Sequence, residues 1–345
     1  MTASTRAPLR RAVLAIAALC AAAPALAAEE LTLYTTREPG LVKPLLAAFT
    51  ARTGVEVNTV FVKDGLLERV KAEGTRSPAD VLMTVDVGNL LDLVEGGVTQ
   101  PVKSAALESA IPAQLRGADG QWFSLSLRAR VLYASKDLPL TTIRYEDLAD
   151  PKWKGKVCTR PGQHPYNTAL VAAMLAHNGE AATEKWLQGF KANLGRKPAG
   201  GDRDVARDIL GGICDIGIAN SYYVGQMKTS KEGSDGRKWG DAIKVVKPAF
   251  GKGGGTHVNI SGAAVAKHAP QRANAVKLLE FLTSPSAQEL YAQANYEYPV
   301  RPGVTLDPVI AAAIGPIKPD TLQLTEIAKH RKAASALIDK VGFDR

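Results

Sequence analysis

The sequence predicts an α/β protein of two lobes with a ligand cleft between them, and three observations indicate this class. Strand and helix patterns alternate over most of the chain, which is typical of βα units around parallel-rich sheets. One extended run, residues 122–135, is long enough to pass from one lobe into another. The 345 residues, 22% charged and 6% aromatic, have globular composition and exceed the usual size of one domain.

The first 27 residues have the pattern of an export signal peptide. Three arginines precede an apolar run over residues 12–23, and the Ala-Leu-Ala sequence at 25–27 fits a cleavage site. No later stretch reaches the about 18 uninterrupted apolar residues that a membrane span needs. We therefore expect cleavage after about Ala27 and a periplasmic protein that is not embedded in the membrane. An arginine pair within the segment leaves the general and the twin-arginine export routes open.

Before the long extended run, strand and helix patterns alternate as βα units. Apolar residues at every second position, or in β-branched runs, indicate strands, and apolar residues three or four apart indicate helices. The expected strands are 31–35, 55–62 and 79–85, and the expected helices are 41–52, 65–73 and 89–95.

Residues 122–135 interrupt this rhythm, because apolar residues alternate with Ser and Arg over the whole run. The βα pattern then resumes. The expected strands are 156–160, 213–219, 242–250 and 257–266, and the expected helices are 168–177, 181–192, 202–210, 269–283 and 284–294.

The order of these elements predicts discontinuous lobes, because one block of βα units is inserted between two pieces of another. The first lobe is expected to contain residues 28–127 plus about 250–300, and the second about 128–249. A mainly helical segment, 301–345, is expected to pack on the lobes.

The sequence carries no motif of an enzyme or of a nucleic-acid-binding protein. It has no Gly-x-Ser-x-Gly elbow, no His-Glu-x-x-His and no paired Cys-x-x-Cys. Residues 251–256 are glycine-rich but lack the order of a phosphate-binding loop, and the five histidines are dispersed. The net charge of +9 is scattered without a polybasic block, which favours a solvated surface. We expect no catalysis and no nucleic-acid partner.

Three tyrosines follow predicted strands and stand near the start of predicted helices. Tyr222 and Tyr223 come just after strand 213–219, and Tyr166 follows strand 156–160 through a turn of Pro and Gly. Open α/β sheets bind their ligands at the carboxyl ends of strands, so these tyrosines are candidate ligand contacts. The alternative for a Tyr-Tyr pair, one ring in the core and one on the surface, stays open.

Two cysteines remain once the export signal is removed, and in an exported protein they are expected to form a disulfide. Cys158 stands eight residues before Tyr166, and Cys214 stands eight residues before Tyr222. A disulfide between them would hold the two loops that follow side by side. Two separate buried thiols are the alternative.

Three phenols in one place suit Fe³⁺, which is a hard cation and prefers anionic oxygen. A free phenol has a pKa of about 10, so binding must release protons and must weaken as the pH falls. Arg128 and Arg130 lie on one face of the extended run and suit a small anion, such as carbonate, that fills further coordination positions. The alternative is that this face is only a strand surface.

At these residues the chain resembles the periplasmic ferric-ion-binding proteins of iron ABC importers. The similarity runs through nearly all of the chain after residue 27. Its specific pieces include SLRARVLY at 126–133, PYN at 165–167, NSYYVG at 220–225 and YEYPV at 296–300.

This resemblance implies the transferrin-like two-lobed fold of type II solute-binding proteins. It implies Tyr166, Tyr222 and Tyr223 as iron ligands, and an inner-membrane ABC permease as partner. In one place the chain departs from its relatives, some of which carry a further Tyr or His just after the first strand. Here the segment is Arg37-Glu38-Pro39, which contains no Tyr or His. Glu38 is a candidate to replace the missing ligand. If Glu38 does not bind the metal, the first lobe is expected to supply only anion contacts.

The expected function is therefore capture of ferric iron in the periplasm, by a monomer, and its delivery to the permease. Two alternatives stay open. One is a solute-binding protein of the same fold that carries an oxyanion or a small organic cation. The other is an exported enzyme on a two-lobed scaffold.

Overall fold

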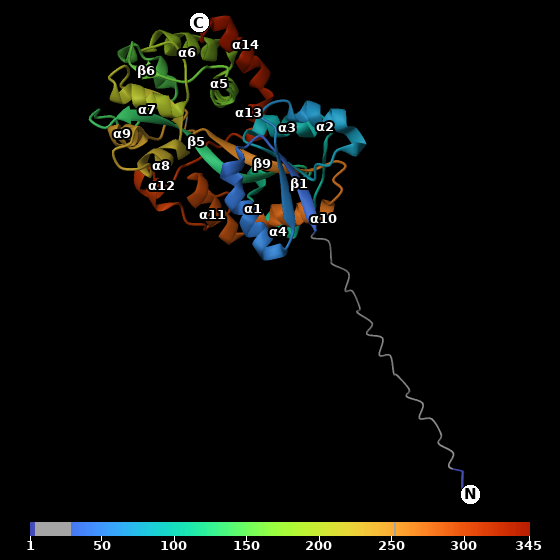
Figure 1. Cartoon of the computed structure of the whole chain (residues 1–345). Coiled ribbons are helices and arrows are strands. Elements are labelled where there is room, and N and C mark those ends of the chain that lie inside the picture. Colours follow the sequence, from blue (N-terminus) through green and yellow to red (C-terminus); the bar gives the residue numbers. More distant parts are fainter. Residues whose placement is uncertain (4–28, 252) are drawn as a thin grey trace.

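The computed structural model describes residues 1–3, 29–251 and 253–345 (Figure 1). The predicted export signal lies, except for its first three residues, outside the described residues, so cleavage after Ala27 stays a prediction. Among the described residues, no helix combines the length and the apolar character that crossing a membrane requires.

In the described part of the chain, nine strands are joined in the order β2-β1-β3-β9-β5-β7-β6, with β4 beside β9 and β8 beside β5. The strands are β1 (Glu30–Thr35), β2 (Glu56–Phe61), β3 (Val81–Thr84), β4 (Thr99–Gln100), β5 (Phe123–Ser135), β6 (Val157–Cys158), β7 (Ile216–Asn220), β8 (Ile243–Val246) and β9 (Val258–Ala266).

Helices cover these strands on both faces, so β3, β7 and β9 are buried along their whole length. The helices are α1 (Pro39–Thr53), α2 (Leu66–Glu73), α3 (Val87–Glu95), α4 (Ala105–Ala110), α5 (Pro165–Asn178), α6 (Glu180–Ala192), α7 (Asp202–Leu210), α8 (Tyr222–Lys228), α9 (Asp235–Ala242), α10 (Arg272–Leu282), α11 (Pro285–Asn295), α12 (Pro308–Ala313), α13 (Leu324–Lys329) and α14 (Arg331–Val341). Short 3₁₀ helices are η1 (Gly74–Arg76), η2 (Ala113–Leu115), η3 (Glu146–Ala149) and η4 (Pro151–Trp153).

Strand β5 changes partners along its length, as its long alternating pattern predicts. Its first part, 123–129, pairs with β9, and its second part, 130–135, pairs with β7 and β8. We call β1–β4, β9 and the first part of β5 the first lobe, and β6–β8 with the second part of β5 the second lobe (Figure 1). The residue boundaries predicted for the two lobes stay a prediction, and this change of partner supports them.

Among the named strands of the described residues, parallel pairing occurs only within the βα units. Strand β1 pairs in parallel with β2 and β3, and β6 pairs in parallel with β7, as alternating strands and helices predict. The two long strands β5 and β9 pair antiparallel with all of their neighbours. The fold is therefore mixed α/β, and its centre is antiparallel because the chain crosses between lobes and later returns.

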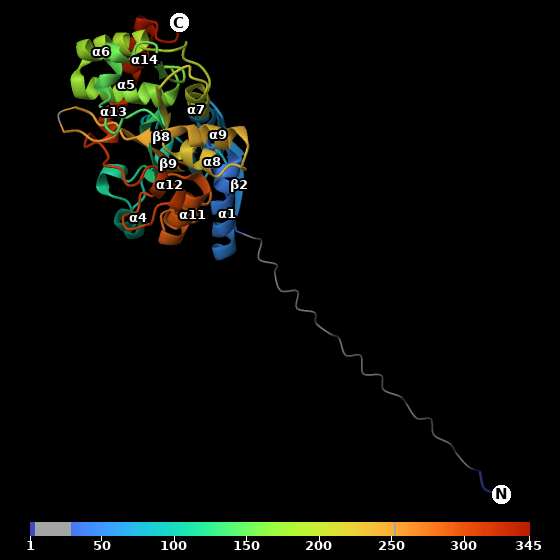
Figure 2. The ribbon, with the colours of Figure 1, turned by 90° about the vertical axis from the view of Figure 1, so that its left-hand side faces the viewer.

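The C-terminal segment packs against both lobes. Helix α12 lies beside α8, α13 contacts α3 and α5, and α14 packs on α5 and α6 (Figures 1 and 2). Arg331, the first residue of α14, donates from Nη1 to Asp92 and from Nη2 to Asn89, both at 3.0 Å. Asp92 and Asn89 belong to α3, so this contact joins the C-terminal segment to the first lobe.

The predicted disulfide is confirmed. Cys158 at the end of β6 and Cys214 just before β7 are bonded, with their Cα atoms 5.9 Å apart. Both side chains are buried. Because β6 and β7 are parallel neighbours, the loops that follow them leave the same edge of the sheet.

Replacing both cysteines by alanine is expected to lower the free energy of unfolding by about 4 kcal/mol. The physical reason is that the bond closes a loop between residues 56 apart in sequence and restricts the unfolded chain. Denaturant unfolding of the wild type and the double variant measures the difference. Titration of the denatured, unreduced protein without the export signal should find no thiol, and two reactive thiols would contradict the pairing.

Candidate metal centre

The three predicted tyrosines lie together at the carboxyl ends of β6 and β7. Tyr222 and Tyr223 begin α8 directly after β7, and Tyr166 lies in the first turn of α5. The Oη atoms of Tyr166 and Tyr222 are 3.4 Å apart, and the ring centres of Tyr222 and Tyr223 are 4.1 Å apart. The structure thus brings the two halves of the predicted site into contact.

Local features hold both tyrosine segments. Pro165 stands at the start of α5, and the Nδ1 atom of His164 accepts from the backbone N–H of Tyr166 at 3.2 Å. Ser221, the residue before α8, makes no side-chain capping hydrogen bond to that helix. Its hydroxyl instead accepts from the backbone N–H of Ala129, at 3.1 Å, and so fastens the start of α8 to the crossing strand.

All three tyrosines line one cavity of about 430 Å³ between the two lobes. The first-lobe side of this cavity consists of residues after β1 and β3, together with one from the segment after α11. These residues are Thr36, Arg37, Glu38, Leu41, Val85 and Glu297. A ligand in this cavity would therefore touch both lobes.

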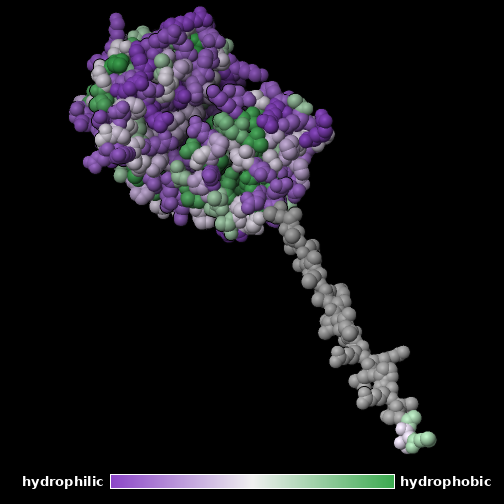
Figure 3. All heavy atoms as spheres, in the orientation of Figure 1, coloured by the Kyte–Doolittle hydropathy of each residue, from purple (hydrophilic) through white to green (hydrophobic). Residues whose placement is uncertain are grey.

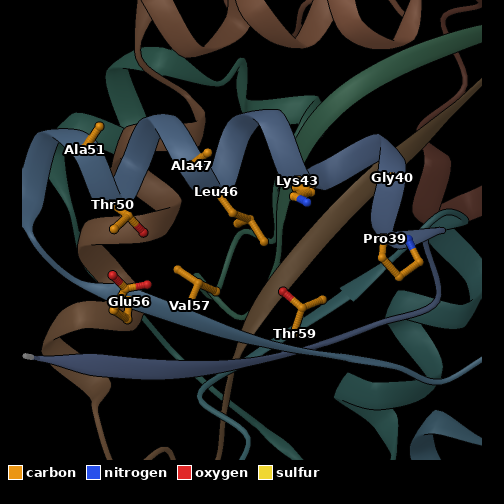
Figure 4. Close-up of a pocket in the computed structure, with 10 residues that line it drawn as sticks. All are labelled: Pro39, Gly40, Lys43, Leu46, Ala47, Thr50, Ala51, Glu56, Val57 and Thr59. Carbon is orange, nitrogen blue, oxygen red and sulfur yellow. The ribbon is translucent and has the colours of Figure 1, made fainter.

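A second cavity, of about 590 Å³, lies between α1 and β2 on the outer side of the first lobe (Figure 4). Its charged lining residues, Lys43 and Glu56, are separated by Leu46 and Val57. The surface around α1 is also where hydrophobic residues gather in Figure 3, while the face of the second lobe is mostly hydrophilic. The lining of the cavity between α1 and β2 has no set of anionic oxygens for a hard cation. The cavity with the tyrosines is therefore the candidate site.

Burial makes two of the tyrosines weaker acids. Tyr222 is 7% exposed, and Tyr223 is half-buried. Burial, and then the neighbouring phenols, raise the pKa of Tyr222 well above its ordinary value. Burial, and then the carboxylate of Asp202, raise the pKa of Tyr223. Without a metal ion, both phenols stay protonated at neutral pH, so a metal ion must displace their protons.

Arg128 lines the cavity as a buried cation that pairs with no carboxylate of the described residues. Its side chain is 2% exposed, and its guanidinium carbon lies 5.0 Å from the centre of the Tyr166 ring. It donates from Nη2 to the carbonyl of Val85, while Nε and Nη1 have no partner among the described residues. Burying an uncompensated charge is costly. The arrangement therefore favours an anion beside Arg128.

Arg130 is also buried, but it already has a partner of opposite charge. It donates from Nη1 to Asp202 at 2.6 Å and to Asn220 at 3.1 Å, and from Nη2 to Asn167 at 2.6 Å. It lines a small recess behind Tyr166 rather than the cavity itself. The anion role predicted for Arg130 stays a prediction, with less support than that of Arg128.

Glu38 reaches the cavity from the first lobe. It stands just before α1, is exposed, and accepts no capping hydrogen bond from that helix. Its carboxylate is thus available to a ligand in the cavity, although it lies at the rim.

Sequence reasoning missed Glu297 as a residue of the cavity wall. Glu297 forms a buried ion pair of 3.1 Å with Arg37, and Ser126 donates to it as well. Both of its oxygens are therefore occupied. The YEYPV sequence contains Glu297, but nothing local indicates that its partner stands 260 positions earlier.

Sequence reasoning predicted the helix over residues 202–210 but missed that its first two residues, Asp202 and Arg203, belong to the site. Asp202 accepts from Arg130 and from the backbone N–H of Asn220 at 2.8 Å. The next residue, Arg203, is exposed, lines the cavity and lies with its guanidinium 5.9 Å from the ring centre of Tyr223. The only local signal was a Gly-Gly-Asp-Arg sequence at a helix start.

Residues 76–320 match the family described as bacterial extracellular solute-binding proteins, and the chain belongs to this family. Members of this class are binding components of transport systems, not enzymes. The mixed α/β fold and the cavity between two lobes agree with that membership.

Within this class, the chain is similar to proteins that are named for iron. It is 42% identical over 318 residues to Iron uptake protein A1 of Synechocystis, a match that covers 91% of this chain and 88% of that protein. It is 72% identical to a Bordetella ferric binding protein of known structure, with a TM-score of 0.87 and coverage of 92% and 100%. It is 39% identical to a Trichodesmium protein solved in complex with iron and citrate, with a TM-score of 0.86 and coverage of 91% and 99%. The predicted resemblance to periplasmic ferric-ion-binding proteins is confirmed.

Proposed function

We propose that this protein captures Fe³⁺ in the periplasm through tyrosinate ligands from Tyr166, Tyr222 and Tyr223, and delivers it to an inner-membrane ABC permease. The observation that carries the proposal is the convergence of three phenols on one cavity between the lobes. The iron-related names of proteins 39–72% identical to this chain support the choice of metal. We expect the protein to act as a monomer.

The charges of the site suit Fe³⁺ better than a divalent cation. Three phenolates together carry the charge that neutralises Fe³⁺, and hard anionic oxygen is the donor that this ion prefers. Among the described residues, no group of three or more His, Cys, Asp or Glu side chains is placed to hold a metal. The tyrosines are thus the donor set that this part of the chain offers.

An anion held by Arg128 completes the proposed site. Because three phenolates neutralise the charge of Fe³⁺, they leave the positive charge of Arg128 without compensation. A small oxyanion such as carbonate, in contact with both Arg128 and the metal, does this and fills coordination positions. The Trichodesmium relative holds iron together with citrate, which supports an anion that accompanies the metal. Glu38 is a further candidate ligand from the first lobe.

The unpartnered nitrogens of Arg128 favour one competing function, the binding of an oxyanion without iron. The visible spectrum of the purified protein distinguishes the two functions. Bound Fe³⁺ with phenolate ligands gives a charge-transfer colour, which carboxylate or water ligands do not give. A colourless protein that binds no Fe³⁺ but binds an oxyanion would overturn the proposal.

Acidification is expected to release the iron. Because burial raises the pKa of Tyr222 and of Tyr223, protons compete strongly for these oxygens. Each phenol that must lose a proton weakens apparent iron binding roughly tenfold per pH unit of acidification. Titration of the charge-transfer band against pH, with and without bicarbonate, measures this loss. A band that is constant across the acidic range would contradict phenolate ligation.

A further inference from the structure

We propose that Asp344, next to the C-terminus, is a positioning residue for Tyr166. Its carboxylate holds the loop, residues 161–164, that presents Tyr166 to the cavity. The inference rests on the proposed function of Tyr166 as an iron ligand, and it assigns a role in that site to the end of the chain.

The carboxylate of Asp344 accepts hydrogen bonds from two successive backbone amides of this loop. Its Oδ1 accepts from the backbone N–H of Gly162 at 2.6 Å, and its Oδ2 accepts from the backbone N–H of Gln163 at 3.0 Å. Hydrogen bonds to an ionised acceptor are short and strong compared with neutral ones. Two such bonds from one carboxylate fix the orientation of the loop as well as its position.

Further contacts press the loop against the C-terminal segment. The Gln163 side chain donates from Nε2 to the carbonyl of Ser335 at 2.9 Å, and the Ser335 hydroxyl donates back to Oε1 at 2.8 Å. A Cβ atom at Gly162 would lie 2.8 Å from the ring of Phe343, so the backbone approaches as closely as glycine allows. Figure 1 shows α14 beside α5, the helix that this loop precedes.

Among the described residues, the remaining side-chain hydrogen bonds of the loop all involve the helix that it precedes. Asn167 donates to the carbonyl of Pro161, and Thr168 donates to that of Gly162, both at 3.2 Å. These bonds move with α5 and do not tie the loop to another element. Asp344 therefore ties the loop to a different element of the fold. The nearer of the two tied residues, Gln163, stands three residues before Tyr166, whose phenol is the proposed metal ligand.

Small displacements matter in such a site, because metal ligands must be held within about 0.5 Å of the productive geometry. Asp344 is half-buried and Gln163 is exposed, so water can replace the carboxylate when it is removed. The fold is then expected to survive while the loop, and with it Tyr166, becomes less well placed.

The test compares Asp344→Ala with Lys340→Ala as a matched control. Lys340 belongs to the same C-terminal segment, but among the described residues its ion pair is with Glu184 of α6, at 2.7 Å, and not with the loop. Asp344→Ala is expected to weaken Fe³⁺ binding 10- to 100-fold, measured by competition with a chelator, and to shift the charge-transfer band. Lys340→Ala should resemble the wild type, and Asp344→Asn, which keeps one acceptor oxygen, should fall between.

Two further measurements separate positioning from a general structural effect. In a Tyr166→Phe background, Asp344→Ala should cause no additional loss of iron affinity, because the two residues act through one ligand. Without metal, the Gly162 and Gln163 amides should exchange hydrogen faster in Asp344→Ala, while the amides of β7 keep their protection.

Each failure has its own signature. If Tyr166→Phe weakens binding and Asp344→Ala does not, the inference is wrong and the proposed function stands. An equal loss from Asp344→Ala in both backgrounds also overturns it, since the effect then does not pass through Tyr166. If Tyr166→Phe alone leaves colour and affinity unchanged, the ligand role fails and the inference falls with it.

Discussion

Tyr222→Phe and Tyr223→Phe are each expected to weaken Fe³⁺ binding by more than about 100-fold and to bleach or shift the charge-transfer colour. Loss of a residue that only orients a metal ligand already costs 10- to 100-fold in metal affinity, and loss of a ligand removes a direct bond. Phenylalanine keeps the ring, so the contact between the two rings survives while the oxygen is lost. Chelator competition and the visible spectrum measure the two effects.

The metal-free variants should remain folded. The Tyr222 hydroxyl meets that of Tyr166 at 3.4 Å, a long contact whose loss changes the free energy of unfolding by about 1 kcal/mol or less. Wild-type titration curves and colour in both variants would refute the ligand assignment.

Tyr34→Phe is the suitable control for these variants. Its ring is 1% exposed and its hydroxyl donates to Glu73 at 2.9 Å, outside the cavity. Tyr145 is also buried, but it is a poor control. Its hydroxyl donates to the carbonyl of Arg130 and accepts from the N–H of His257, so Tyr145→Phe leaves two buried backbone groups unpaired.

Local pattern explains why much of this architecture is predictable from the sequence. Alternation over residues 122–135 predicts the crossing strand, because a period of two is a property of the strand itself. Tyrosines that stand just after two parallel strands are predicted to lie close to one another, because parallel strands end at the same edge of a sheet. The disulfide follows from export and from the number of cysteines, and it needs no knowledge of packing.

The parts that could not be predicted depend on contacts between distant segments. Arg128 and Arg130 occupy equivalent places in the sequence pattern, but only packing decides that Arg130 meets Asp202, 72 positions away. The same holds for the contact of Asp344 with Gly162, 182 positions apart. The antiparallel centre of the fold likewise depends on how the returning segment lies against β5, which no local pattern encodes.

Arg128→Ala is expected to move the midpoint of iron release to higher pH and to abolish the effect of added bicarbonate. Without the guanidinium, the anion beside the metal loses its counter-charge, so the complex starts weaker. If three phenol protons are taken up on release, each tenfold loss of affinity moves the midpoint upward by about one third of a pH unit. A 10- to 100-fold weaker complex then shifts the midpoint by roughly one third to two thirds of a pH unit. Titration of the charge-transfer band against pH, with and without bicarbonate, measures the shift.

The contrast between the two arginines makes this test specific. Arg128 is a buried charge that pairs with no carboxylate in the described part of the chain, so in the metal-free protein Arg128→Ala should leave the free energy of unfolding unchanged or raised. Arg130→Ala breaks a buried pair with Asp202, which keeps a longer pair with Arg160 at 3.3 Å, and is expected to destabilise the fold by about 3 kcal/mol. A variant that affects iron release without loss of stability therefore reports the anion. If Arg128→Ala shifts neither the midpoint nor the bicarbonate response, Arg128 does not hold the anion, and Glu38 or water must complete the coordination of the metal.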